Sequence, residues 1–302
     1  NIHVLTLAAH FLSRKLRFSL FKIYVVLSLV RWYNVLLIAF GLYLSALYLF
    51  NIGEPHLEVL KDYKLHLEVV ALSLFIMSGY IINAFYDLEK DLINDPKKAI
   101  FDRLISKEIS FMAYFAFNGI GAFLSLFISW PVFLTNVFFS FALWFYSHKM
   151  RKKAMLSEFA ASLLTILPFI SLSIYYDYTN QTILLFFLFL GTLIFTREVI
   201  KKMIALKGDL ILGDKSIPIV FGTIKTKRLI ITLLIFTSLL VVPVSIVVQS
   251  TIVHGFLALV VLSIIVNFYL TTSKGANNYS KMNIIYKALL ILALLCVPFL
   301  FA

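Results

Sequence analysis

Apolar runs, each close to the roughly 20 residues that a helix needs to cross a bilayer, recur along the whole chain. Of its 302 residues 61% are hydrophobic and only 14% are charged, whereas a soluble domain holds roughly 25% charged residues. We therefore predict an all-α, polytopic membrane protein that forms one transmembrane domain over residues 1–302. The predicted spans are 33–50, 67–87, 109–128, 131–147, 156–175, 181–198, 228–248, 252–271 and 284–302.

The basic residues lie almost entirely on one side of this nine-span arrangement. Of the 27 Lys and Arg residues, only Lys61 and Lys64 fall on the other side. Because cytoplasmic loops collect Lys and Arg, we expect the N-terminus in the cytoplasm and the C-terminus outside. Residues 1–31 mix basic and apolar side chains, which indicates an interfacial amphipathic helix. The net charge of +12 is then a collar that attracts anionic lipid headgroups, and it does not indicate a nucleic-acid partner.

Two long loops on the predicted cytoplasmic side, 88–108 and 197–228, hold most of the acidic residues. At the start of the first loop, Asn83, Asp87 and Asp91 are spaced at i, i+4 and i+8, so they share one face of a helix. Two carboxylates and an amide oxygen so close together favour a divalent cation, and Mg²⁺ binds such oxygen ligands together with substrate phosphates. In the simpler alternative, the two aspartates only mark the point where the helix leaves the membrane.

Several further motifs accompany this one, and together they resemble the UbiA superfamily of intramembrane prenyltransferases. The resemblance covers most of the chain and is closest to the branch of geranylgeranylglyceryl-phosphate transferases, which favours a prokaryotic cytoplasmic membrane. The stretches that carry it are Arg31-Trp32-Tyr33-Asn34, 83–91, 93–98, Ile105-Ser106, Tyr146-Ser147 with the basic stretch 149–153, 197–209 and 215–222.

The resemblance implies a UbiA-type helical bundle in which Mg²⁺ ions grip the diphosphate of a polyprenyl donor. Ionisation of that donor gives an allylic carbocation, which a membrane-associated acceptor captures. The implied catalytic residues are Asn83, Asp87, Asp91 and Asp209, the first three being metal ligands. The implied diphosphate-binding residues are Arg31, Asn34, Lys149, Arg197, Lys201 and Lys202, although each basic one could instead belong to the cytoplasmic collar.

The second loop departs from the family pattern. Lys202 and Ala205 stand where relatives usually carry aspartates, and Glu158 stands in a place where many have asparagine. We therefore expect one Mg²⁺ site rather than two. Either Lys202 substitutes for the missing metal, or the chain has lost its chemistry and serves as a structural or lipid-binding subunit with membrane-protein partners. A terpene cyclase of the same fold and a transporter are further alternatives.

Overall fold

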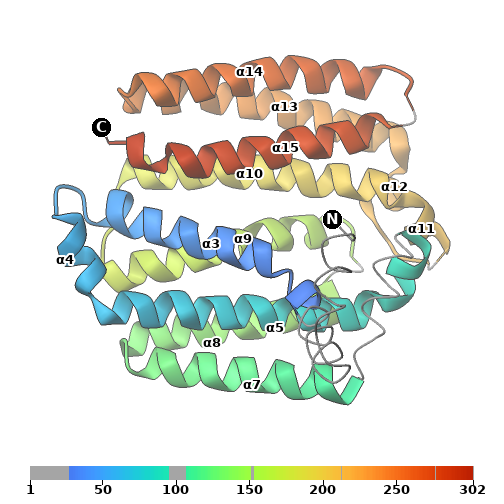
Figure 1. The fold of residues 1–302 in the computed structure, drawn as a ribbon. Coiled ribbons are helices and arrows are strands. Elements are labelled where there is room, and N and C mark those ends of the chain that lie inside the picture. The colour runs from blue at the N-terminus through green and yellow to red at the C-terminus, as the bar shows by residue number, and fades with distance from the viewer. Residues whose placement is uncertain (1–26, 95–106, 151–152, 212, 276, 302) are drawn as a thin grey trace, which may run out of the picture.

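The computed structural model describes residues 27–94, 107–150, 153–211, 213–275 and 277–301, and for 87–94 and 107 it describes the backbone alone. Its long helices run side by side, and the short helices α11 and α12 lie at the end of the bundle where α5 ends (Figure 1). Most of the predicted interfacial helix 1–31 lies outside the described residues, so it stays a prediction.

The described residues form helices and no strands, as the composition predicts. The elements are α3 (Trp32–Ser45), η1 (Ala46–Phe50), α4 (His56–Lys61), α5 (Tyr63–Asn94), α7 (Lys107–Leu126), α8 (Trp130–Phe145), η2 (Tyr146–Met150), α9 (Leu156–Tyr176), α10 (Gln181–Ile204), α11 (Leu206–Ile211), α12 (Ile217–Val220), α13 (Gly222–Val247), α14 (Thr251–Thr272), α15 (Asn278–Cys296) and η3 (Val297–Phe299).

Eight helices of the described chain are long and apolar enough to cross a membrane. They match eight of the nine predicted spans, and the exception is the run 131–147. There α8 has only 16 residues, but it continues into the five-residue π-helix η2 because Tyr146 keeps helical backbone angles (φ −57°, ψ −53°). Every predicted span is therefore helical over most of its length, whereas the side on which each end lies stays a prediction.

The two predicted loops, 88–108 and 197–228, are shorter in the structure because the flanking helices extend into them. Helix α5 continues to Asn94, α10 continues to Ile204, and α13 already begins at Gly222. Apolar runs mark where a helix meets the bilayer surface, but Lys, Arg and Glu are good helix formers and extend the helix into the polar region. The second loop is thus reduced to 205–221, and most of it is taken up by α11 and α12.

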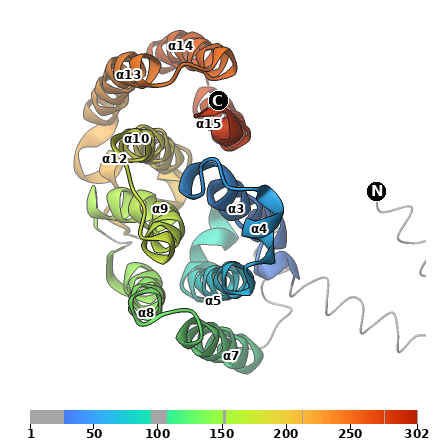
Figure 2. The same cartoon turned by 90° about the vertical axis from the view of Figure 1, so that its left-hand side faces the viewer.

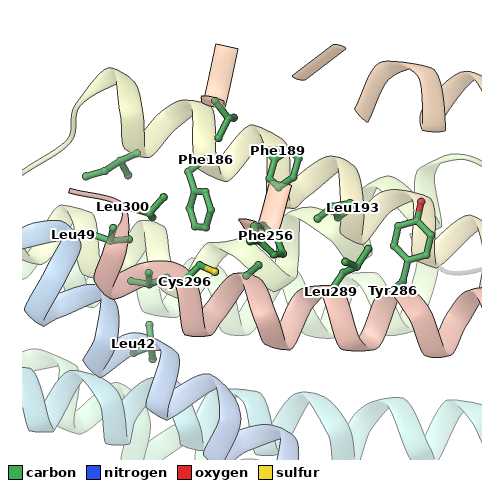
Figure 3. Close-up of a cluster of buried hydrophobic side chains, with 14 of the residues drawn as sticks. Leu42, Leu49, Phe186, Phe189, Leu193, Phe256, Tyr286, Leu289, Cys296 and Leu300 are labelled. Atoms are coloured by element: carbon green, nitrogen blue, oxygen red, sulfur yellow. The ribbon is translucent and has the colours of Figure 1, made fainter. Parts of the chain in front are cut away.

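Seen along the helix axes, α5, α7 and α8 occupy one end of the bundle and α13 and α14 the other (Figure 2). Helices α3, α9 and α10 lie between these groups, and α10 packs against α9, α13 and α15. Figure 3 shows the buried core along α10, where Phe186, Phe189 and Leu193 meet Phe256 of α14 and Leu289 of α15. This core fixes the position of α10, whose last turns carry the charged residues of the candidate site.

Candidate active site

A cavity of about 430 Å³ lies between helices α3, α5, α8, α9, α10 and α15. Most of its wall is apolar and comes from the middle of these helices. Its charged and large polar lining residues all come from the side of the bundle next to α11 and α12, whereas the remaining wall is apolar apart from Ser45 and Thr165, so the cavity has one polar end and a mainly apolar remainder. The charged and large polar residues of that end are Arg31, Asn34, Tyr80, Asn83, Tyr146, Arg197, Glu198 and Lys201.

Tyr80 of α5 organises one side of this polar end. The guanidinium carbon of Arg31 lies 5.2 Å from the centroid of the Tyr80 ring, within the range of a cation–π contact. The amide nitrogen of Asn34 donates a hydrogen bond to the Tyr80 hydroxyl at 3.3 Å. Arg31 precedes α3 in a left-handed conformation (φ 49°), which non-glycine residues rarely adopt. The structure thus brings the predicted residues Arg31 and Asn34 together through Tyr80.

The predicted metal motif lies on one continuous helix, because α5 runs unbroken through Asn83, Asp87 and Asp91. Asn83 lines the cavity, and its side-chain oxygen accepts a hydrogen bond of 2.7 Å from the Ser147 hydroxyl of η2. The side chains of Asp87 and Asp91 lie outside the described residues, so their roles stay predictions. A helical backbone nevertheless keeps all three residues on one face.

The end of α10 forms the opposite side. Arg197 lines the cavity and donates from Nε to the side-chain oxygen of Asn283 on α15, at 3.0 Å. Lys201 also lines the cavity, and its ammonium lies 2.8 Å from Glu198. Both predicted cations are therefore present at the polar end, although Lys201 is partly neutralised.

Lys202 and Lys149 occupy different places. Lys202 is not among the lining residues, and its ammonium lies 4.0 Å from the carboxylate of Glu158, which is 1% exposed. Lys149 is exposed on η2 and does not line the cavity either. Asp209 is fully buried in α11, which packs against α5.

Sequence reasoning missed Tyr80 and Asn283. Tyr80 could have been found, because it precedes Asn83 by three residues and so shares its helical face. Asn283 had no such signal, since it lies near the start of the last apolar run and meets Arg197 only through the packing of α10 against α15.

The donor chemistry of the motif on α5 fits Mg²⁺, which prefers carboxylate and amide oxygens. The second loop fits a metal less well, because Lys202 and Ala205 supply no oxygen ligand and the nearby Glu158 faces an ammonium. Among the side chains that the structure describes, no three acidic, His or Cys residues gather into a metal-binding group.

Residues 44–290 match the sequence model of the UbiA prenyltransferase family, which covers most of the chain. The chain belongs to the UbiA prenyltransferase family. Membership agrees with the bundle of long apolar helices. It also confirms the resemblance that the sequence motifs indicated.

The chain is similar to several digeranylgeranylglyceryl phosphate synthases, including those of Korarchaeum cryptofilum and Methanothermobacter thermautotrophicus. It is 28% identical to that of Korarchaeum cryptofilum over 181 residues, which are 60% of this chain and 64% of the relative. It is 27% identical to that of Methanothermobacter thermautotrophicus over 146 residues, which are 48% of this chain and 51% of the relative. Both matches span less than two thirds of the relative's length.

Solved structures share the fold over nearly the whole chain. A structure of digeranylgeranylglyceryl phosphate synthase superposes with a TM-score of 0.67 at 22% identity, covering 92% of this chain and 97% of that one. A UbiA homologue from Archaeoglobus fulgidus bound to DMAPP and Mg²⁺ gives a TM-score of 0.63 at 17% identity, covering 90% and 98%. At these identities the likeness shows the fold.

Proposed function

We propose that this protein is a membrane prenyltransferase that transfers a polyprenyl group from its diphosphate to a membrane-associated acceptor, with one Mg²⁺ at the motif on α5. The observation that carries this proposal is the two-part cavity. Its polar end contains Asn83, Arg31 and Arg197, and the rest of its wall is mainly apolar. A polyprenyl diphosphate has the same two parts, a charged head and an apolar tail.

In this proposal Asn83, Asp87 and Asp91 hold the metal ion. Bound Mg²⁺ supplies positive charge that stabilises the leaving diphosphate. Arg31 and Arg197 add donors on two further sides of the same head group, and a guanidinium can make two parallel hydrogen bonds to phosphate oxygens. The apolar wall holds the isoprenoid and keeps water away from the cation that forms when the diphosphate leaves.

We assign Lys202 to charge balance with Glu158 rather than to diphosphate binding, since it lies outside the cavity lining. The names of the relatives favour a prenyl diphosphate donor and a glyceryl phosphate acceptor. The ligands of the structural neighbours, DMAPP or GPP with Mg²⁺, also favour a prenyl diphosphate donor. All of these relatives are archaeal, which supports the prediction of a prokaryotic membrane.

The test is release of diphosphate by purified protein in lipid nanodiscs, using C10, C15 and C20 prenyl diphosphates with and without geranylgeranylglyceryl phosphate. We expect release that requires Mg²⁺ and an acceptor. Asp87→Asn and Asp91→Asn should each slow it by about 100-fold or more, the scale on which loss of one electrostatic stabiliser slows an enzyme.

Asp177→Asn is the matched control for these variants. Asp177 is exposed at the C-terminal end of α9 with φ 48°, a conformation that Asn tolerates, so this change should leave the rate unaltered. Absence of diphosphate release with every donor would contradict the proposed function. Release without any acceptor would instead indicate a cyclase of the same fold.

One observation favours a second candidate, a lipid-binding subunit without catalysis. Two lysines near the polar end face glutamates, Lys201 facing Glu198 and Lys202 facing Glu158, so less positive charge is left for a diphosphate. This candidate predicts that cells tolerate the double variant Asp87→Ala/Asp91→Ala and that the protein copurifies with a stable membrane partner.

A further inference from the structure

The two arginines of the polar end are each held by a neutral side chain from another helix. Arg197 of α10 donates from Nε to Asn283 of α15 at 3.0 Å. Arg31 lies with its guanidinium carbon 5.2 Å from the centre of the Tyr80 ring on α5. Among the described side chains, neither arginine forms an ion pair, whereas Lys201 faces Glu198 at 2.8 Å.

These contacts leave the charge and the outer edge of each guanidinium available. A guanidinium has five N–H donors, and the bond from Nε to Asn283 leaves the four terminal ones. The Tyr80 ring contacts Arg31 by a cation–π interaction, which does not neutralise its charge. A neutral partner orients a cation without neutralising it, so both arginines can bind an anion in the cavity.

We propose that Asn283 and Tyr80 are positioning residues that orient Arg197 and Arg31 toward the diphosphate of the prenyl donor. This inference rests on the proposed function for the identity of the anion. Asn283 acts from the side of α15 and Tyr80 from the side of α5, so donor binding depends on how these two helices pack around α10 and α3.

The experiment measures binding of geranylgeranyl diphosphate to purified protein without acceptor, by isothermal titration. Asn283→Leu removes the acceptor oxygen and keeps the side-chain volume, and we expect it to weaken binding about 10-fold, the lower end of what loss of an orienting partner costs. The same change in an Arg197→Ala background should have no further effect, because the two residues act as one unit. Tyr80→Leu should weaken binding more than Tyr80→Phe does, because Phe keeps the ring beside Arg31 and loses only the hydroxyl that accepts from Asn34.

Asn277→Ala, an exposed change just before α15, is the control and should bind the donor normally. Thermal unfolding of each variant separates a loss of fold from a loss of orientation, and Asn283→Ala serves as a second variant at that site. Unchanged binding in a folded Asn283→Leu protein, or additive losses with Arg197→Ala, would overturn the inference. A wild-type protein that binds no prenyl diphosphate would overturn the proposed function itself, and this inference with it.

A second inference concerns a different place, a fully buried acidic residue among α5, α7, α8 and α9. Glu68 of α5 is 0% exposed, and one of its oxygens lies 2.7 Å from the Ser171 hydroxyl of α9. Its other oxygen accepts from the amide nitrogen of Asn136 on α8 at 2.8 Å. The Ser171 hydroxyl also lies 2.7 Å from the Asn136 side-chain oxygen, which closes a ring of three contacts.

The three hydrogen bonds of this ring need one proton more than Asn136 and Ser171 supply, so an ionised Glu68 cannot complete the ring. Three hydrogen bonds need three protons, and the Asn136 amide and the Ser171 hydroxyl give one each to the ring. If Ser171 donates to Asn136, its contact with Glu68 needs a proton on Glu68. If the oxygen and nitrogen of the Asn136 amide are exchanged, the amide oxygen faces Glu68 and can form a hydrogen bond only with a protonated Glu68. The need for a proton on Glu68 therefore does not depend on the amide orientation.

The charges around Glu68 agree with this count. A carboxylate buried in a membrane protein is costly unless it is paired, and no ion pair of Glu68 occurs among the described residues. Lys64, one turn earlier on α5, donates instead to the backbone oxygen of Ile128 at 3.2 Å. The second N–H of the Asn136 amide donates to Ser125 of α7 at 3.0 Å, so the ring joins four helices.

We infer that Glu68 is a neutral carboxylic acid whose proton completes a hydrogen-bonded ring with Asn136 and Ser171. The ring holds the wall of the cavity next to it, because Phe139 and Pro168 line the cavity and lie three residues from Asn136 and Ser171. Its role is to join helices, and it takes no part in the proposed transfer reaction.

The experiment compares infrared spectra of wild-type protein and Glu68→Gln at neutral pH. We expect the wild type to show the C=O stretch of a protonated carboxyl group that is absent from Glu68→Gln. Gln keeps an N–H donor and an acceptor oxygen at these positions and adds a second N–H, so its thermal midpoint should lie close to that of the wild type and above that of Glu68→Ala. Glu68→Ala leaves Asn136 and Ser171 without these partners and should lower the midpoint by several degrees. If Glu68→Gln instead lacks the bands of an ionised carboxylate that the wild type shows, and the wild type shows no such C=O band, the inference is overturned.

Discussion

At the scale of single residues, positions 158 and 202, where the sequence resemblance indicated departures from the family pattern, lie beside each other. The Lys202 ammonium is 4.0 Å from the Glu158 carboxylate, and the side chains are 13% and 0% exposed. A buried acidic group needs a nearby cation or a proton, so these two substitutions offset each other's charge. This pairing explains why the chain can carry both without an uncompensated charge in the bundle.

This pairing predicts an asymmetric response to mutation. Lys202→Met removes the cation and leaves Glu158 buried, which should lower the free energy of unfolding by up to about 3 kcal/mol. The double variant Lys202→Met/Glu158→Gln removes both charges and should recover most of that loss. Thermal unfolding in detergent measures the stability of the single and the double variant. Equal midpoints for the two variants would show that the two side chains are not coupled.

At the scale of helices, close contacts depend on small residues. A Cβ atom added at Gly121 of α7 would lie 3.1 Å from the Phe75 ring of α5, which is 1% exposed. A Cβ added at Gly119, two residues earlier on the same helix, would meet nothing within 4 Å. The two glycines therefore separate the effect of packing from the intrinsic preference of a helix for Ala over Gly.

We predict that Gly119→Ala stabilises the protein by up to about 1 kcal/mol, because Ala is the better helix former. Gly121→Ala gains the same preference but crowds a rigid ring in the core, and overpacking costs about 1–3 kcal/mol. Its thermal midpoint should therefore fall below that of Gly119→Ala. Two variants with the same midpoint would mean that α5 and α7 separate easily at this contact.

The helices also show how far the sequence could be interpreted alone. Hydropathy located all nine apolar runs, because burial in lipid requires long apolar segments. It could not locate the ends of α5, α10 and α13, since those turns are polar and continue the helix beyond the apolar run. The spacing of Asn83, Asp87 and Asp91 could be recognised because it lies within nine consecutive residues of the sequence. Asn283 could not, because its contact with Arg197 joins residues 86 positions apart.

At the scale of the whole molecule, the predicted orientation in the membrane rests on the distribution of the basic residues. Cys296 is the only cysteine and is buried, so we expect little labelling of the native chain when new cysteines are introduced. Lys227→Cys should react with a membrane-impermeant maleimide only after intact cells are opened, and Lys61→Cys should react before. The opposite pattern would reverse the predicted orientation and place the polar end of the cavity outside the cell.

The proposed transferase activity depends on a metal–diphosphate site built on α5. The most direct measurement counts bound Mn²⁺, in place of Mg²⁺, by electron paramagnetic resonance in protein saturated with a non-hydrolysable geranylgeranyl diphosphate analogue. We predict one Mn²⁺ per chain, which is lost in the double variant Asp87→Asn/Asp91→Asn and kept in Asp177→Asn. No bound Mn²⁺ in the wild type, or binding that survives the loss of Asp87 and Asp91, would contradict the account.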